Sequence, residues 1–334
     1  MISQIFKTLL LSISCCALLC LGCSKQDNPA YSGPTTKITI GIYKGELSSV
    51  VYIAEQLGYF KQMGLDVELR DFESGAAAVK ALNEGKVDLA TAADFVFVSN
   101  VSKFPDLRAV AGINSAKNIF IVARKDRGIR NSADLKGKRI AVTFTTPSEY
   151  FLGKQLNDSR LNINQVTMVN VTPTTMEKEM LEGKFDAAIA WNPVAQRIRQ
   201  SMGTNAVSWN AQSESFFHML LIARDNLIKR ESSAMARLMK ALILAENSIS
   251  SDPLKAQQYI AQRIGMPEKY ITEVWGEYQF RVYLDRSLLL ALEDESRWLA
   301  NARGGAENAQ PNYLDYLYLD ALKTARPESV TIIN

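Results

Sequence analysis

A motif that occurs twice limits the possible folds of this chain more than any other feature. Residues 84–94 read EGKVDLATAAD, and residues 182–192, which lie 98 positions further on, read EGKFDAAIAWN. In each copy a glycine can end a helix, a lysine and an aspartate suit a solvated turn, and an alanine-rich strand can follow. Similarity at one fixed spacing indicates that the chain uses one structural unit twice.

The segments around both copies share one order of strands and helices. Short β-rich runs predict strands at residues 37–43, 66–72 and 87–91, and again at residues 139–144 and 165–170. Amphipathic segments predict helices at residues 49–57 and 76–84, and at residues 174–180 in the second copy. This alternation predicts an α/β protein in which each copy forms a mainly parallel sheet flanked by helices.

Two such units predict two lobes with a cleft between them. Residues 118–124 suit one crossover between the lobes, and residues 218–223 suit the return. We therefore assign residues 37–124 and 218–334 to lobe one, and residues 125–217 to lobe two. The pattern from residue 226 onward is helical, which predicts a helical C-terminal extension on lobe one. Because parallel sheets bind ligands at the carboxyl ends of their strands, the cleft is the expected binding site.

Composition and charge exclude several classes of function. The 334 residues include 38 Lys and Arg against 35 Asp and Glu, and a net charge of +3 is too small for a nucleic-acid-binding protein. All four cysteines lie at positions 15–23, so the body beyond Ser24 has no disulfide, thiol nucleophile or cysteine metal site. The one histidine, His218, lies in an apolar run, which favours a buried, hydrogen-bonded histidine near the hinge over a ligand contact or catalyst. We therefore expect no metal and no cofactor.

The N-terminus has the pattern of an exported protein. Lys7 precedes an apolar run at residues 8–21, and its 14 residues are fewer than the roughly 20 that a membrane-spanning helix needs. Residues 1–22 are therefore predicted to form a signal peptide. The polar residues 23–36 are predicted to form a tether.

The end of this signal peptide resembles a bacterial lipoprotein box. It reads CLGC, and the resemblance implies that Cys23 is lipidated and becomes the mature N-terminus. Ser24 stands behind it in place of an aspartate, which would favour the outer membrane. Cys20 and Leu21 depart from the usual box, so cleavage as an ordinary signal peptide is the alternative.

Further motifs resemble a known family. Residues 58–69, GYFKQMGLDVEL, and residues 84–88, EGKVD, look like the substrate-binding proteins of ABC importers of the nitrate, sulfonate, taurine and thiamine-precursor type, the SsuA/THI5-like family. Residues 124–129 and 132–142 are similar to the start of lobe two in that family, and the resemblance covers residues 37–299. It implies a two-lobed periplasmic-binding-protein fold of type II. Such lobes close around a small-molecule solute and deliver it to an ABC permease in the inner membrane.

The resemblance also implies a monomeric periplasmic protein that is not an enzyme, with two alternatives. One is an enzyme on the same bilobal fold, for which the sequence offers carboxylates such as Asp94 and Glu149 together with His218, but no nucleophile paired with a base. A related enzyme that builds the thiamine pyrimidine from its own histidine has a cysteine-rich iron motif, which this chain lacks beyond Ser24. The other alternative is a module that presents the solute to a signalling receptor.

Positions at strand ends and helix starts select the candidate ligand-binding residues. They are Tyr43, Lys44, Ser48, Ser49, Ser74, Asp94, Phe95, Thr145, Thr146, Ser148, Glu149, Thr172, Trp191 and Asn192. The rings of Tyr43 and Trp191 can form flat walls for a ring or an alkyl chain of a solute. Lys44 suits solvent as well as it suits pairing with a ligand.

The helix starts allow both a structural and a ligand-binding interpretation. Thr146 and Glu149 can form a capping box around Pro147, or Glu149 can face the ligand. Free amides and hydroxyls of Thr145, Thr146 and Ser148 can cradle an anion. Ser48 and Ser49 can do the same from lobe one, although plain helix capping explains them equally well.

Asp94 decides which solute the sequence favours. It begins a predicted helix, so it is either an N-cap or a negative charge in the binding site. A negative charge would oppose a sulfonate or nitrate, and would favour an amine or a nitrogen heterocycle. The sequence therefore favours a small polar solute with an amine or ring nitrogen, with a sulfonate as the alternative.

Overall fold

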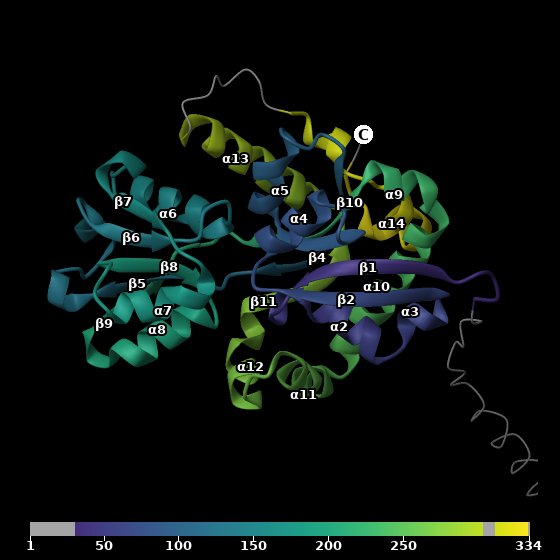
Figure 1. Cartoon of the computed structure of the whole chain (residues 1–334), viewed down its shortest axis with the longest axis horizontal. Helices are drawn as coiled ribbons and strands as arrows, with labels where there is room; N and C mark the ends of the chain where they lie inside the picture. Colours follow the sequence, from purple (N-terminus) through teal and green to yellow (C-terminus); the bar gives the residue numbers. More distant parts are fainter. Residues whose placement is uncertain (1–30, 303–310, 333–334) are drawn as a thin grey trace, which may run out of the picture. The chain divides into compact units, whose positions relative to one another are not determined.

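The computed structural model describes residues 31–302 and 311–332 of the chain (Figure 1). The predicted signal peptide, Cys23 and Ser24 lie outside the described residues. In the described part, no helix is both long enough and apolar enough to cross a membrane. Pro34–Asn334 forms one compact unit that contains a six-stranded and a five-stranded sheet. We refer to these as the sheets of lobe one and lobe two.

The sheet of lobe one is mixed, in the order β11-β4-β10-β3-β1-β2. Its strands are β1 Thr36–Tyr43, β2 Leu65–Phe72, β3 Leu89–Ala93, β4 Leu107–Ala116, β10 Phe217–Arg224 and β11 Tyr278–Tyr283. Strand β1 is parallel to β2 and β3, as predicted from the sequence. Strand β10 runs antiparallel to β3 and β4, because the chain comes back from lobe two in the opposite direction.

The sheet of lobe two repeats this arrangement in the order β7-β6-β8-β5-β9. Its strands are β5 Ile119–Arg124, β6 Arg139–Val142, β7 Thr167–Asn170, β8 Ala187–Trp191 and β9 Ala206–Asn210. Strand β6 is parallel to β7 and β8, whereas β5 is antiparallel to β8. Each lobe therefore has a parallel core of three strands with antiparallel strands added to it.

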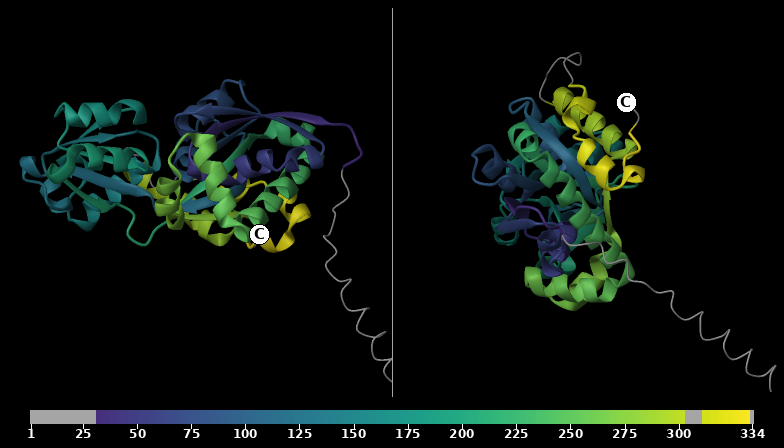
Figure 2. Two further views of the ribbon diagram at one scale, coloured as in Figure 1. Left: turned by 90° about the horizontal axis from the view of Figure 1, so that it is seen from below. Right: turned by 90° about the vertical axis from the view of Figure 1, so that its right-hand side faces the viewer.

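Helices cover both sheets, and the C-terminal ones belong mainly to lobe one (Figures 1 and 2). Their bounds are α2 Ser49–Gln56, α3 Tyr59–Gln62, α4 Gly75–Asn83, α5 Asp94–Val101, α6 Pro147–Asp158, α7 Pro173–Leu181, α8 Val194–Met202, α9 Asp225–Arg230, α10 Ser232–Ser251, α11 Pro253–Ile264, α12 Glu268–Val274, α13 Arg286–Ala302 and α14 Asp320–Ala325. Helix α10 packs on α2, α3 and α14, and α11 packs on α2. The predicted helical extension on lobe one is confirmed.

The repeated motif has the same structural role in both lobes. Gly85 and Gly183 follow α4 and α7 with φ angles of 70° and 72°, the left-handed conformation that glycine adopts without strain. Asp88 then accepts a hydrogen bond from the backbone N–H of Thr39 at 2.8 Å, and Asp186 accepts one from Arg139 at 2.9 Å. Each motif aspartate therefore ties its own loop to the first of the three parallel strands of its lobe, and is more than a solvated turn residue.

The crossover between the lobes differs from the prediction at one strand. The sequence predicts a crossover at residues 118–124, assigned to lobe one, whereas residues 119–124 form β5 and pair with β8 and β9 in lobe two. The physical reason is that Ile121, Val122 and Ala123 are fully buried when they join that sheet. The chain therefore crosses at residues 117–118 and returns through residues 211–216 to β10.

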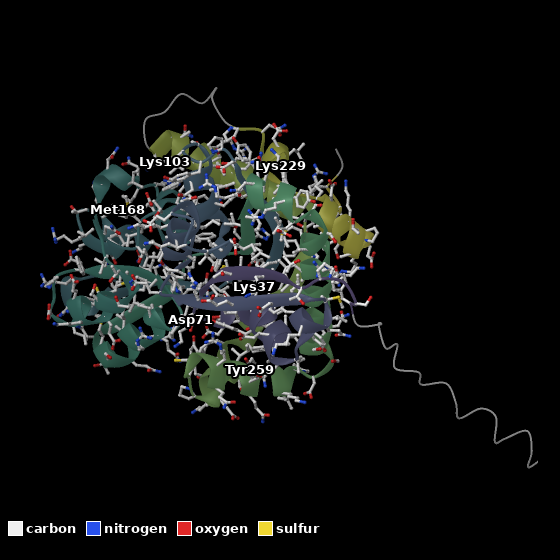
Figure 3. All side chains as sticks on the ribbon, turned by 45° about the vertical axis from the view of Figure 1, so that its right-hand side comes forward. Lys37, Asp71, Lys103, Met168, Lys229 and Tyr259 are labelled. Atoms are coloured by element: carbon white, nitrogen blue, oxygen red, sulfur yellow. The ribbon has the colours of Figure 1, made fainter. Side chains whose placement is uncertain are left out.

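Buried apolar side chains fill the space around both sheets. Tyr52, Phe95 and Phe97 are among the largest fully buried side chains of lobe one. At roughly 25 cal/mol per Å² of buried apolar surface, such side chains supply most of the stabilisation of a domain. Most charged side chains lie outside, as Figure 3 shows for Lys103 and Lys229.

Helix α13 belongs to lobe one but packs against both lobes. It contacts α5 of lobe one and α6 of lobe two. The ring of Trp298 lies on the backbone of Gly153 in α6, so close that a Cβ at this glycine would be 2.3 Å from the ring. The Tyr150 hydroxyl donates a hydrogen bond to Asp294 of α13, and Lys154 forms an ion pair with the same carboxylate at 3.5 Å.

Candidate functional site

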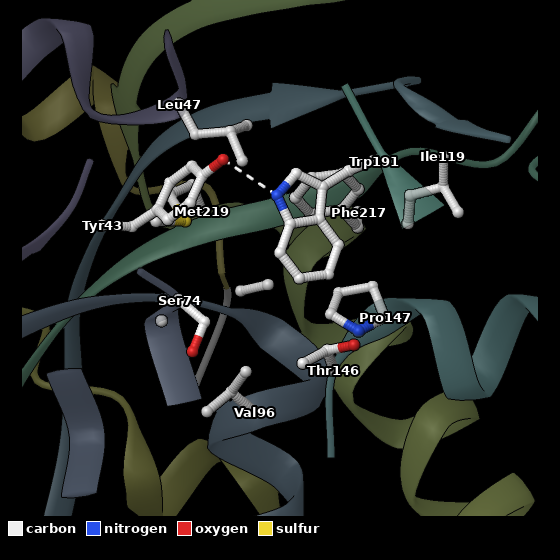
Figure 4. Close-up of a pocket in the computed structure, with 12 residues that line it drawn as sticks. Tyr43, Leu47, Ser74, Val96, Ile119, Thr146, Pro147, Trp191, Phe217 and Met219 are labelled. Atoms are coloured by element: carbon white, nitrogen blue, oxygen red, sulfur yellow. Dashed lines mark hydrogen bonds between the residues drawn. The ribbon is translucent and has the colours of Figure 1, made fainter. Parts of the chain in front are cut away.

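A small cavity lies where strand ends of the two sheets meet (Figure 4). It is lined by Tyr43, Leu47, Ser74, Gly75, Ala93, Val96, Ile119, Thr146, Pro147, Trp191, Phe217 and Met219. Tyr43, Ala93 and Trp191 are the last residues of β1, β3 and β8, so the cavity lies at the carboxyl ends of the parallel strands. Its volume of about 30 Å³ has room for about one water molecule.

An aromatic pair joins the two lobes across this cavity. The indole N–H of Trp191 donates a hydrogen bond to the Tyr43 hydroxyl at 2.8 Å, as the dashed line in Figure 4 shows. The two rings meet edge to face, with centroids 6.3 Å apart and planes at 79°. Burial raises the pKa of the Tyr43 phenol well above its usual value, so this group stays neutral. A solute in the cavity therefore contacts an aromatic ring and a neutral polar group of each lobe.

Two helices begin at the cavity. Ser74 precedes α4 and accepts a hydrogen bond from the backbone N–H of Ala77 at 3.2 Å, which confirms the predicted cap. Thr146 precedes Pro147 at the start of α6. Because helix N-termini carry partial positive charge, both can bind an acceptor group of a solute.

The predicted capping box at α6 does not form. The Thr146 hydroxyl donates to the carbonyl of Thr143 at 2.6 Å, and Glu149 accepts from the backbone N–H of Thr145 at 2.7 Å. The reason is the left-handed backbone of Thr145, with a φ of 59°, which places that amide next to the Glu149 carboxylate. Glu149 is therefore used within the loop before α6 and does not line the cavity.

Asp94 lies in the interior of lobe one and not on the cavity wall. Its side chain is fully buried and accepts hydrogen bonds from the backbone N–H groups of Phe95 at 2.9 Å and His218 at 2.7 Å. Burial raises the pKa of Asp94 to about 7 and that of the neighbouring Glu295 well above its usual range. Of the two interpretations of Asp94, this placement favours the structural one: the carboxylate joins the first turn of α5 to β10.

The remaining candidates fall into three groups. Tyr43, Ser74, Thr146 and Trp191 line the cavity. Buried residues that do not line it are Ser48, Ser49, Phe95, Ser148 and Asn192, while Lys44 and Thr172 are exposed and Thr145 is half-buried. The hydroxyls of Ser48 and Ser49 donate to the carbonyls of Tyr43 at 2.7 Å and Glu46 at 2.6 Å, so they fix the loop after β1.

Sequence reasoning missed most of the apolar cavity wall. Ile119, Phe217 and Met219 lie at the two crossovers, and that position is the signal that could have identified them. Side chains alternate along β10, so His218 points away from the cavity between two residues that face it. As predicted, it is buried and hydrogen-bonded, through Nδ1 to the Tyr283 hydroxyl, and burial lowers its pKa to about 4.

Known proteins match both the sequence and the fold. Over 210 residues the chain is 24% identical to a binding protein of Brucella abortus, and the match covers 62% of this chain and 64% of that protein. Over 230 residues it is 25% identical to the taurine-binding periplasmic protein of Escherichia coli, covering 63% and 68% of the two chains. The matches thus span about two thirds of the length of these relatives.

Solved structures match over most of the chain. The alkanesulfonate-binding protein SsuA from Xanthomonas axonopodis pv. citri, bound to MOPS, superposes with a TM-score of 0.72 at 20% identity, covering 86% of this chain and all of that one. The desulfurization enzyme DSZB superposes with a TM-score of 0.66 at 12% identity, covering 87% and 99%. These neighbours show the two-lobed periplasmic-binding-protein fold. The NMT1/THI5-like family model matches residues 48–256, and the chain belongs to this family.

Proposed function

We propose that this protein is the solute-binding component of an ABC importer, and that it holds a small polar organic solute between its lobes. The observation that carries the proposal is the cavity at the strand ends, whose wall joins Tyr43 of lobe one to Trp191 of lobe two by a hydrogen bond. A taurine-binding relative and an SsuA neighbour with an alkanesulfonate-binding title support it.

Solute capture would work by closure of the lobes about their crossovers. The chain passes between the sheets at residues 117–118 and 211–216, which are short segments without strand pairing of their own. A solute that contacts both walls of the cavity has more interactions when the walls are close together. Its binding would therefore favour the closed arrangement by the difference in its affinity for the two states.

We favour a solute with an amine or a ring nitrogen, with a sulfonate as the alternative. No lysine, arginine or histidine is among the described residues that line the cavity. A sulfonate would therefore depend on the N-termini of α4 and α6 for its binding. An amine could instead interact with the aromatic rings and the neutral oxygen atoms of the cavity wall. The sulfonate- and taurine-binding relatives support the alternative.

We also propose that the protein performs no catalysis. The chain has no cysteine beyond Cys23, and His218, its one histidine, is buried away from the cavity. The likeness to DSZB concerns the fold, at 12% identity. Presentation of the solute to a signalling receptor would use the same binding site.

The solute that copurifies with the protein provides the test. We expect mass spectrometry of the denatured protein to release one small polar organic compound. Adding that compound to stripped protein should raise the melting temperature and reduce the radius of gyration in small-angle scattering. Binding without compaction would contradict lobe closure, and absence of any bound or binding solute would contradict the proposed function.

Membrane attachment through Cys23 is a further part of the proposal. We propose a periplasmic, monomeric protein anchored by a lipid at Cys23, with Ser24 favouring the outer membrane. Cys23→Ala should move the protein from the membrane fraction to the soluble periplasmic fraction, or stall its processing. Unchanged membrane association of this variant would contradict the anchor, and Cys20→Ala is the matched control that should stay attached.

A further inference from the structure

Glu46 is a buried carboxylate that lacks a counter-charge. It begins the 3₁₀ turn Glu46–Ser48 between β1 and α2, and its side chain is fully buried. In residues 31–302 and 311–332, neither of its carboxylate oxygens has a hydrogen-bond partner of regular geometry, and it forms no ion pair. The Tyr270 hydroxyl interacts with it and lowers its pKa, but burial has the larger effect and raises the pKa above its usual value.

The other polar groups around Glu46 add further acceptors. The charge of Glu46 raises the pKa of Glu277 and that of Tyr278. Glu277 accepts a hydrogen bond from Asn192 at 3.0 Å, and the Tyr278 hydroxyl accepts one from Asn118 at 3.1 Å. These two asparagines use their amide N–H groups there, which leaves each side-chain carbonyl oxygen buried. Within the described part of the chain, neither carbonyl oxygen has a partner. The region thus offers at least two carboxyl groups and two unpartnered amide oxygens, and the hydroxyls of Tyr270 and Tyr278 are donors beside them.

This acceptor-rich region adjoins the cavity. Glu46 precedes Leu47, Asn118 precedes Ile119 and Asn192 follows Trp191, and each of these three neighbours lines the cavity. A Coulombic effect of Glu46 also raises the pKa of Tyr43, another lining residue. The oxygens themselves are buried and do not line the cavity, so the region lies directly behind the apolar wall.

An ammonium group suits this region, because it would donate hydrogen bonds to the unpartnered oxygens and bring a positive charge next to Glu46. A buried carboxylate is costly unless it is paired, and a buried oxygen without a donor is costly as well. A primary ammonium has three donors and one positive charge, whereas a sulfonate or carboxylate would add acceptors where donors are lacking. No lysine or arginine is among the described groups that shift the pKa of Glu46 itself, whereas Arg199 lowers the pKa of the neighbouring Glu277.

We propose that Glu46, together with the side-chain oxygens of Asn118 and Asn192, binds the ammonium group of an aliphatic amine solute. This inference rests on the proposed function and specifies its solute class. In this proposal Glu46 binds the positive charge of the solute, a role for which the sequence suggested Asp94. The other end of the solute would lie toward the starts of α4 and α6.

Matched pairs of amines and alcohols test the proposal by calorimetric titration. We would use taurine against isethionate, β-alanine against 3-hydroxypropionate, and propylamine against 1-propanol. The wild-type protein should bind at least one amine about tenfold or more tightly than its alcohol partner. Glu46→Gln should reduce this preference to about twofold or less. Glu214→Gln removes a fully exposed charge from the return crossover at residues 211–216, and should leave the preference for the amine unchanged.

The stability of the empty protein gives a second readout. Glu46→Gln replaces a buried, unpaired carboxyl group by a neutral amide of the same size, so its melting temperature should equal or exceed that of the wild type. A Glu46→Gln protein that fails to fold would show a structural role and overturn the proposal. Asn118→Ala, which leaves Glu46 in place, should lower the preference for the amine about threefold or more, and an unchanged preference would also overturn it.

The outcomes separate this inference from the proposed function. Equal binding of amines and alcohols by the wild type, or an amine preference that survives in Glu46→Gln, overturns the ammonium site and leaves solute capture intact. The ammonium site is also overturned, and solute capture stays intact, if no amine of the panel binds while another solute copurifies. If no solute binds or copurifies at all, both proposals fail.

Discussion

Asp94→Ala is expected to lower the free energy of unfolding by about 2 to 6 kcal/mol, because each of two buried N–H groups left without an acceptor costs about 1 to 3 kcal/mol. The substitution leaves the buried N–H groups of Phe95 and His218 without their acceptor, and leaves Glu295 without its neighbour. Urea unfolding measured by circular dichroism would determine the loss. A large effect on stability would show that Asp94 is a structural residue.

Asp94→Asn is the matched control for this substitution. Its amide oxygen can still accept one of the two backbone hydrogen bonds, and its N–H group can donate to Glu295, so we expect a loss of about 1 kcal/mol. The opposite pattern would contradict the structural role. In that case Asp94→Ala would be nearly as stable as the wild type but would lose affinity for its solute.

The same buried pair makes stability depend on pH in a definite direction. The pKa of Asp94 is raised to about 7 in the folded protein, above the value of about 4 in an unfolded chain. The folded state therefore keeps a proton that the unfolded state releases, and its stabilising effect is lost as the pH rises from about 4 through about 7. The double variant Asp94→Asn/Glu295→Gln should lack this loss when both proteins are unfolded between pH 5 and pH 8.

His218 remains in both proteins, so its titration cancels in this comparison. Its pKa is lowered to about 4 in the folded protein, so its contribution is lost as the pH falls below the unfolded value of about 6.5. As the pH rises through this range, the titration of Asp94 lowers the stability of the folded protein, whereas that of His218 raises it. A stability difference between the wild type and the double variant that does not change with pH would contradict the raised pKa of the acid pair.

Gly75→Ala is expected to cost about 2 to 3 kcal/mol, in the upper part of the range for overpacking. A Cβ at Gly75 would lie 2.7 Å from the Cα and 2.9 Å from the Cβ of Ala92, in the middle of the lobe-one sheet. Backbone cannot rotate aside as a side chain can, so α4 would have to move away from β3. Thermal and urea unfolding would measure the loss.

Gly276→Ala is the control for this prediction. No heavy atom lies within 4 Å of a Cβ at Gly276, and its backbone is not left-handed. Its stability should equal or slightly exceed that of the wild type, because alanine reduces the freedom of the unfolded chain. If Gly75→Ala were as stable as Gly276→Ala, the contact between α4 and β3 would be adaptable, contrary to our expectation.

The sequence could predict the features of the fold that depend on neighbouring residues. Gly85 and Gly183 end helices because the left-handed conformation is a local property, and the same motif in both lobes identified the repeat. The position of β5 could not be predicted in this way. Its run of buried apolar residues would suit either sheet, and the choice depends on the partner strands β8 and β9, which occur much later in the chain.

The candidate site was predictable to a similar extent. Strand ends identified Tyr43 and Trp191, because the geometry of parallel sheets places these positions at one edge. The charged candidates were not predictable in this way. Whether Asp94 lines the cavity or is buried inside lobe one depends on distant groups, such as Glu295 and His218, that no local pattern indicates.

The contact of Trp298 with Gly153 gives the contact between the lobes a temperature dependence. Helix α13 rests an indole of lobe one on the backbone of α6 in lobe two, so separating the lobes would expose this ring to water. Burial of apolar surface is driven mainly by entropy near 25 °C and weakens on cooling. Part of the free energy that holds the lobes together therefore decreases in the cold, and closure would depend more on the solute at low temperature.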